Sequence, residues 1–173
     1  TLAAMKMSVL NKLLEQRAYT DAHTGLPNKD ACEVLLNNKE TVAKHTACMM
    51  FDLNNLKIIN DTKGHSKGDQ LILNFARLLR NVIPQKDFVG RYGGDEFMVV
   101  IYNTSKTEIE DILKQLSREK DRLNSSGNNM PIDYACGWAI SDADSECTIQ
   151  MLLDKADYYM YENKQAYKKS KKS

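Results

Sequence analysis

Two carboxylates follow two glycines in the stretch from Arg91 to Phe97, and carboxylates in such a position are candidate ligands of a cation. Gly93 and Gly94 precede Asp95 and Glu96, and apolar runs flank all four. This pattern predicts a β-hairpin, because glycine tolerates the positive φ that tight hairpin turns require. Adjacent acids at the mouth of a buried strand repel each other and lose hydration, which a bound cation would offset. The alternative is a solvated acidic turn, and these residues alone favour neither interpretation.

A third carboxylate ends an earlier strand. Residues 46–53 are apolar without alternation up to Asp52, which predicts a strand buried on both faces. The expected order is strand, helix, strand, strand, helix, strand and a last helix, and the first six elements make a ferredoxin-like βαββαβ core. A right-handed crossover then places the hairpin tip at the edge where the first strand ends. If the third strand pairs with the first, Asp52 and Asp95 become neighbours across an antiparallel ladder.

Carboxylates that converge at one sheet edge suit Mg²⁺, which keeps some waters and takes further ligands from substrate phosphates. Mn²⁺ prefers the same ligands and is the alternative ion. Two such ions would serve phosphoryl transfer, one by activating a hydroxyl and the other by neutralising the leaving phosphates. Lys57 and Lys164 could contribute charge there. Taken alone, however, Lys57 is a solvated helix lysine, and the lysines near the end of the chain suit a helix C-terminus.

Asn60 and Asp69 have the chemistry to recognise a nucleobase. Guanine presents an N1–H and an exocyclic amine on one edge, and a carboxylate can accept a hydrogen bond from both. The alternative for each residue is ordinary turn or cap chemistry. His65 is interpreted as a structural residue of a polar loop, residues 64–69, because no nucleophile or zinc partner accompanies it.

The remaining pattern supplies the elements that must position these side chains. Gly25 and Pro27 predict a turn over residues 21–28, which by itself is a linker. Residues 1–20 predict a helix that either packs on its own domain or ends a coiled-coil stalk. We expect an α+β fold in which helices flank an antiparallel central sheet. The expected helices are 1–20, 29–39, 54–61, one from Leu71 to Val82, 106–123 and one from 148, and the expected strands are 46–53, 86–92, 95–102 and 132–140.

Composition bounds the class of protein. The chain has 173 residues, of which 42% are hydrophobic and 27% charged, which suits one domain (21–173) behind an N-terminal signalling or linker helix (1–20). A net charge of +1 argues against a nucleic-acid or membrane partner. No run is long enough to span a bilayer, and four cysteines without a CxxC pair indicate reduced thiols in a cytoplasmic protein. The chain begins without methionine inside a helical pattern, which we interpret as a piece of a longer protein.

Several motifs in order resemble one family. The stretch from Gly93 to Phe97 is the GGDEF signature, and Arg91-Tyr92, the stretch 51–61, the loop 64–69 and the turn 21–28 also fit. Over about residues 19–168, the chain is similar to a GGDEF-type diguanylate cyclase domain of bacterial signalling proteins. The resemblance implies a core of the nucleotidyl cyclase and polymerase-palm type, and condensation of two GTP molecules into cyclic di-GMP with release of pyrophosphate.

The resemblance also implies roles for individual residues and for partners. Each domain would hold one GTP, so catalysis would need a homodimer controlled by an upstream sensor domain. The domain would be cytoplasmic, in a parent protein that is either cytoplasmic or membrane-anchored. The alternatives are a catalytically silent GTP receptor and a regulatory dimerisation module. By position, the resemblance implies that Asp52, Asp95 and the Leu53 carbonyl would bind Mg²⁺, and that Glu96 would act at the metal or the attacking 3′-hydroxyl. Asn60 and Asp69 would contact guanine, and Lys57 and Lys164 would face the phosphates. Gly93 and Gly94 would let the backbone approach the nucleotide.

Three positions depart from the family pattern. The product-inhibition motif, Arg-x-x-Asp, here has Pro84 in place of the arginine, so only Asp87 remains and weak or absent feedback is expected. Lys168 stands where the family commonly has arginine, and it would bind a phosphate as a point charge. Asn54 replaces an acid found in many members, which reduces the negative charge near the presumed ligands.

Overall fold

The computed structural model describes residues 1–127, 130–141 and 146–172. Residues 128–129, 142–145 and 173, all within the predicted domain 21–173, lie outside the described residues. Ten helices and strands follow one another in the described chain. In order, they are α1 (Leu2–Tyr19), α2 (Lys29–Leu36), β1 (Ala47–Leu53), α3 (Leu56–Lys63), α4 (His65–Val82), β2 (Phe88–Arg91), β3 (Glu96–Ile101), α5 (Lys106–Ser125), β4 (Tyr134–Ile140) and α6 (Ile149–Lys172).

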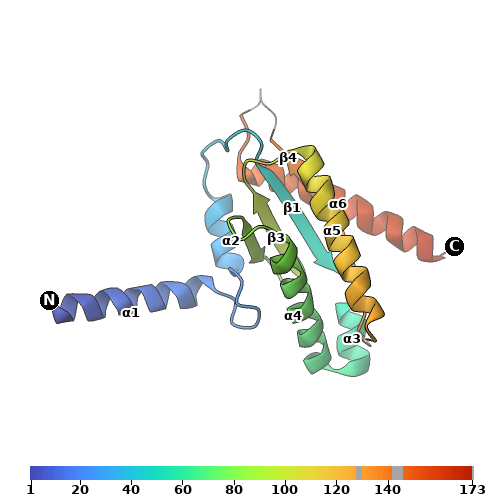
Figure 1. Ribbon diagram of the computed structural model, residues 1–173, viewed down its shortest axis with the longest axis horizontal. Helices are drawn as coiled ribbons and strands as arrows, with labels where there is room; N and C mark the ends of the chain where they lie inside the picture. The colour runs from blue at the N-terminus through green and yellow to red at the C-terminus, as the bar shows by residue number, and fades with distance from the viewer. Residues whose placement is uncertain (128–129, 142–145, 173) are drawn as a thin grey trace.

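The four strands form one antiparallel sheet in the order β2-β3-β1-β4. This order, with α3 and α4 crossing from β1 to β2 and α5 crossing from β3 to β4, is the ferredoxin-like arrangement. The predicted α+β fold is therefore confirmed. β1 is central, and every one of its residues is buried because helices cover both faces of the sheet (Figure 1).

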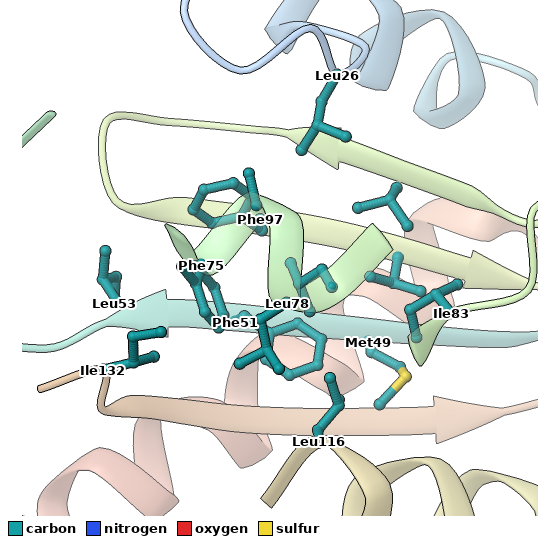
Figure 2. Packing of buried hydrophobic residues seen from close by; sticks show 14 of the residues in the cluster. Leu26, Met49, Phe51, Leu53, Phe75, Leu78, Ile83, Phe97, Leu116 and Ile132 are labelled. Atoms are coloured by element: carbon teal, nitrogen blue, oxygen red, sulfur yellow. The ribbon is translucent and has the colours of Figure 1, made fainter. Parts of the chain in front are cut away.

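Alternate residues of the central strands divide the core into two layers. Met49 and Phe51 pack with residues of α4 and α5, whereas Cys48 and Met50 pack with residues of α2 and α6. Figure 2 shows the first layer, in which aromatic rings from β1, β3 and α4 meet. The ring of Phe75 on α4 meets those of Phe51 and Phe97 edge to face, with centroids 5.9 Å and 5.0 Å apart.

The second layer brings α6 unusually close to β4. A Cβ at Gly137 would lie only 2.1 Å from the carbonyl oxygen of Ala156 and from the amide nitrogen of Met160. Only glycine can fit at this position, because both neighbouring atoms belong to the backbone of α6. This contact fixes the path of α6, a helix of 24 residues, along the sheet and toward the edge where β1 ends.

The predicted polar loop over residues 64–69 is wrong. Gly64 adopts a φ of 88°, and its amide closes α3 by donating to the Asn60 carbonyl. The chain therefore turns directly into α4 at His65, and Asp69 lies within that helix. The error arose because the first apolar side chain of α4 comes only at Leu71, so its first turns carry none of the periodicity that predicts a helix.

α1 projects away from the sheet and its covering helices (Figure 1). None of its residues is buried, and its apolar side chains, from Leu2 to Leu14, are at least half exposed. This exposure gives no support to packing of α1 on its own domain, and the coiled-coil stalk stays a prediction. No helix within the described ranges combines the length and the apolar character needed to cross a bilayer.

Candidate active site

The ends of β1 and β3 bring three carboxylates to one edge of the sheet. Asp52 pairs with Glu96 in the antiparallel register, and the amide of Leu53 donates to the Asp95 carbonyl at 2.8 Å. The third strand pairs with the first, and Asp52 and Asp95 are neighbours across the antiparallel ladder as predicted, although Glu96 and not Asp95 lies directly opposite Asp52. Side chains alternate between the two faces along a strand, so Asp52 lies on the same face as Met50, and Glu96 on the same face as Met98. This is the face that α6 covers.

The hairpin tip is built differently from the two-residue turn that the Gly-Gly pair suggested. Four residues, 92–95, separate β2 from β3, and neither Gly93 nor Gly94 adopts a left-handed φ. The amides of Tyr92 and Gly93 both donate to the Glu96 carbonyl, at 2.8 Å and 3.1 Å. The longer loop does not need residues of positive φ. The expected positive φ at the glycines is therefore wrong, although the predicted hairpin is present. A Cβ at Gly94 would meet no atom within 4 Å, so the tip is open on this side.

The turn at residues 21–28 braces this tip. The Arg91 guanidinium lies 3.2 Å from the Asp21 carboxylate and donates to the Gly94 carbonyl at 2.9 Å. Burial opposes ionisation of Asp21, but hydrogen bonds from Thr24 and the Arg91 charge prevail and lower its pKa. By itself, the sequence of this turn predicted only a linker. The pairing of an acid at the start of the domain with the arginine before the two glycines was not predicted.

Asp52 is the most buried of the three acids, with 7% of its surface exposed. One carboxylate oxygen, Oδ2, contacts the Lys164 ammonium at 2.5 Å, while Oδ1 is buried and has no hydrogen-bond partner. Burial, reinforced by the charge of Asp52, raises the pKa of Asp95 and of Glu96. The edge therefore holds more negative charge than its neighbours neutralise.

This arrangement could hold a divalent cation. The Lys164 ammonium lies where a metal ion could also neutralise Asp52, and the unpartnered Oδ1 of Asp52 is a free ligand atom. Among the described residues, no three His, Cys, Asp or Glu side chains are grouped closely enough to hold a metal ion by themselves. The donor set thus suits an ion such as Mg²⁺, which accepts few protein ligands and completes its shell with water and phosphate oxygens.

A cleft of about 600 Å³ opens beside the carboxylates, between the start of α3 and the end of α6. Lys57 lies on the α3 side, and Lys164 and Lys168 lie on the α6 side. α3 begins at Leu56 without a side-chain cap, and a helix N-terminus with uncapped amides favours anions. The cleft therefore combines cationic side chains, backbone donors and a carboxylate edge, including Asp95. This combination suits a phosphate chain bound with a divalent cation.

Asn60 and Asp69 lie together, but apart from that cleft. Asn60 rests against the first turns of α4, since a Cβ at Gly68 would lie 1.8 Å from its Oδ1. Asp69 is the next residue, and its carbonyl is 2.8 Å from Nε2 of His23. Neither predicted guanine contact lines the lysine cleft.

Asn54, which departs from the family pattern, and Asp87, which remains of the product-inhibition motif, both have hydrogen-bond partners in the chain. Asn54 is buried, and its side-chain amide donates to the Asp133 carboxylate at 3.3 Å. An acid here would face Asp133, so asparagine suits this chain. Asp87 is also buried, and its Oδ1 accepts a hydrogen bond from the Tyr102 amide at 3.1 Å. Its carboxylate thus joins the end of β3 to the loop before β2.

Comparison with known proteins identifies the family to which the chain belongs. A family profile described as "Diguanylate cyclase, GGDEF domain" matches residues 18–170. The chain belongs to the GGDEF family. The diguanylate cyclase DgcP of Escherichia coli is 30% identical over 92% of this GGDEF chain, and the signaling protein YkoW of Bacillus subtilis is 31% identical over 91%. The chain covers only 48% of DgcP and 20% of YkoW, so both are longer proteins that contain a similar domain.

Names among the relatives do not agree on one activity. The cyclic di-GMP phosphodiesterase PdeB of Shewanella oneidensis is 31% identical over 86% of this chain, which covers 18% of PdeB. Solved structures agree on the fold. The coiled coil and GGDEF domain of DgcB from Caulobacter crescentus has a TM-score of 0.77 at 24% identity, with 95% of this chain and 91% of that chain covered. The activity of this GGDEF domain must therefore be argued from its own residues.

Proposed function

We propose that this GGDEF domain is a diguanylate cyclase, which condenses two GTP molecules into cyclic di-GMP and releases pyrophosphate. One observation carries the proposal. The buried Asp52, with its unpartnered oxygen, lies beside Asp95 and Glu96, and Asp95 lines a cleft together with Lys164, the lysine that contacts Asp52. Such a pairing of surplus carboxylates with cationic side chains matches a metal-bound nucleoside triphosphate and has no evident structural purpose.

Each residue of the edge then has a distinct task. Asp52, Asp95 and the Leu53 carbonyl would hold Mg²⁺ or Mn²⁺, which when bound neutralises phosphate charge and acidifies the attacking hydroxyl. Lys164 would leave Asp52 and turn to the phosphates beside Lys57 and Lys168. Asn60 and Asp69 would select guanine.

Glu96 would take part in the proton transfer. Its raised pKa brings the carboxylate closer to the range in which a base accepts a proton efficiently near neutral pH. It would therefore accept the 3′-hydroxyl proton or assist at the metal. Gly93 and Gly94 would let the backbone approach the nucleotide, which the open side of Gly94 permits.

The reaction needs a second copy of the domain. The family resemblance implies one GTP per domain, and the product joins two, so each domain would present its GTP to that of a partner. A homodimer that faces cleft to cleft meets this requirement. α1, with its exposed apolar side chains, would hold two copies together and connect them to an upstream sensor domain.

A GTP receptor without turnover is the second candidate, favoured by the relatives that are named phosphodiesterases. One assay separates the two. The purified chain is incubated with GTP and Mg²⁺ at several protein concentrations, and cyclic di-GMP is measured by chromatography. Product whose rate rises faster than linearly with protein concentration supports a dimeric cyclase. Bound GTP without product at high concentration would favour the receptor, and absence of GTP binding would reject both.

We expect product feedback through Asp87 to be weak or absent. Pro84 offers no guanidinium for phosphate or guanine, and the Asp87 carboxylate already accepts from the Tyr102 amide. Titration of the wild-type chain with cyclic di-GMP should show no binding below micromolar concentrations. Sub-micromolar binding that Asp87→Ala abolishes, in a variant that stays folded by circular dichroism, would refute this expectation.

A further inference from the structure

The last turns of α6 present one continuous face to the cleft. Lys164, Tyr167, Lys168, Lys171 and Lys172 all line it. Their spacing of three, four, seven and eight residues from the first is the spacing of one helix face. The lysines near the end of the chain are therefore more than cations at a helix terminus, because four of them share a wall with the carboxylate edge.

The face has an inner and an outer end. Lys164 is inner, since its ammonium contacts Asp52. Lys172 lies eight residues further along α6, a separation of roughly 12 Å at the rise of an α-helix. Lys171 and Lys172 therefore lie beyond Lys168, on the side away from the metal-binding carboxylates.

Tyr167 helps to hold the outer end in place. The Lys171 ammonium lies 4.6 Å from the centroid of the Tyr167 ring, a cation–π contact that keeps this flexible side chain on the cleft wall. The facing wall is the start of α3, with Lys57 and uncapped backbone amides. The outer half of the cleft is thus cationic on α6 and rich in donors on α3, while the acids lie at the inner end.

We propose that Lys171 and Lys172 form an outer phosphate subsite that binds the terminal phosphates of the nucleotide and then holds the pyrophosphate leaving group. This inference rests on the proposed cyclase function, and it extends the phosphate site beyond the positions that the family resemblance assigned. The α-phosphate must lie at the inner end, near Asp52, so the β- and γ-phosphates extend toward the outer lysines.

The subsite would act on the step that releases pyrophosphate. The 3′-oxygen of one nucleotide forms a bond to the α-phosphorus of the other, and the bond from that phosphorus to the bridging oxygen breaks. The bridging oxygen leaves with the electron pair as part of pyrophosphate, and the hydroxyl proton passes to Glu96 or to water. Lys171 and Lys172 would stabilise the negative charge that the leaving group carries away.

The test compares two double variants that remove the same charge. Lys171→Ala with Lys172→Ala removes the outer subsite, whereas Lys106→Ala with Lys155→Ala removes two lysines from a different groove, beside β4. Binding of Mg²⁺-pyrophosphate, Mg²⁺-GTP and Mg²⁺-GDP is measured by titration calorimetry on folded chains of all 173 residues. We expect about a tenfold loss of affinity for pyrophosphate and GTP in the first variant, a smaller loss for GDP, and less than about twofold change in the control.

Equal losses in the two variants would overturn the subsite, because they would show general electrostatic attraction only. An equal loss for GDP and GTP in the first variant would also overturn it, since the terminal phosphate would then make no special contact. A wild-type chain that binds neither GTP nor pyrophosphate would overturn the proposed function and this inference with it. Wild-type binding that both variants retain would overturn the subsite while leaving the proposed cyclase intact.

Discussion

The placement of Asp52, Asp95 and Glu96 at one edge of the sheet destabilises the folded chain. One oxygen of Asp52 is held by Lys164, and the other is buried without a partner. Burial of an unsatisfied carboxylate oxygen costs about 1–3 kcal/mol in a typical protein. Replacement of any one acid by a neutral residue should therefore leave the fold intact, which makes the site accessible to mutagenesis.

The first prediction concerns pH. Burial and the charge of Asp52 raise the pKa of Asp95 above its usual 3.8 and that of Glu96 above its usual 4.5. The folded chain thus holds these protons more tightly than the unfolded chain. The stability that the pair contributes is fully present below the usual pKa values and is lost as pH rises through the raised ones. Mg²⁺ binds the ionised form, so it should raise the melting temperature more at about pH 7.5 than at about pH 5.

Thermal melts with and without Mg²⁺ at both pH values check this prediction. The control is Asp95→Asn with Glu96→Gln, in which the gain from Mg²⁺ should be small and independent of pH. The prediction fails if Mg²⁺ stabilises the wild-type chain equally at both pH values, or if it stabilises the control variant as much as the wild type.

At this scale, the sequence could predict which acids meet and could name Lys164 as a nearby cation, but it could not predict the direct contact between Lys164 and Asp52. The buried-strand pattern and the crossover handedness were enough to bring Asp52 next to the hairpin. The contact between Asp52 and Lys164 joins residues 112 positions apart. It depends on the path of α6 across the sheet, which no local pattern encodes. The roles proposed for the site residues stay predictions.

The elements position the site through α6. Its first half packs against β4, and its second half continues past the end of β1 to line the cleft. Gly137 permits this course because the backbone of α6 occupies the space where a Cβ would lie. Gly137, on a neighbouring strand, therefore helps to determine the position of the helix that carries Lys164 and Lys168.

The second prediction is that Gly137→Ala destabilises the chain strongly. A methyl group 2.1 Å from two backbone atoms of α6 must displace that helix, which we expect to lower the free energy of unfolding by about 3 kcal/mol or more. Urea denaturation measures the change. Gly94→Ala is the control, since its Cβ would meet no atom, and it should shift the free energy by less than about 0.5 kcal/mol. Similar stability of the Gly137→Ala chain and the wild type would contradict this account of helix placement.

Element order and fold class were predictable from the sequence because the strands appear as short apolar runs and most helices carry a clear hydrophobic period. The start of α4 was not predictable, since residues 65–69 are polar and glycine-bearing like a loop. The bracing of the hairpin by the turn at residues 21–28 was missed for a different reason. Asp21 and Arg91 become partners only after β2 is placed at the sheet edge beside that turn.

For the whole molecule, the proposed reaction requires two copies, and α1 is the element best suited to join them. The third prediction is that removal of residues 1–17 leaves the domain folded but weakens its self-association. α1 buries no residue of its own, so the melting temperature should change by less than about 4 °C. Sedimentation of the full and shortened chains measures the dimer, and turnover at low protein concentration should fall with it.

The shortened chain also tests the predicted boundary between a helix at 1–20 and a domain at 21–173, which stays a prediction. The family profile begins at residue 18, close to that boundary. Loss of folding on removal of residues 1–17 would show that α1 belongs to the domain. Undiminished dimerisation would show that the two copies meet through another surface.

Turnover by Asp95→Ala tests the central claim most directly. Wild-type and variant chains are incubated with GTP and Mg²⁺ at the same high concentration, and cyclic di-GMP is measured by chromatography beside an unfolding curve of each chain. We predict product from the wild type and at least a hundredfold less, in order of magnitude, from Asp95→Ala. The variant should also be at least as stable as the wild type, because a repelling carboxylate is gone. Comparable product from a folded Asp95→Ala chain would contradict the assignment of this edge as the metal-dependent active site.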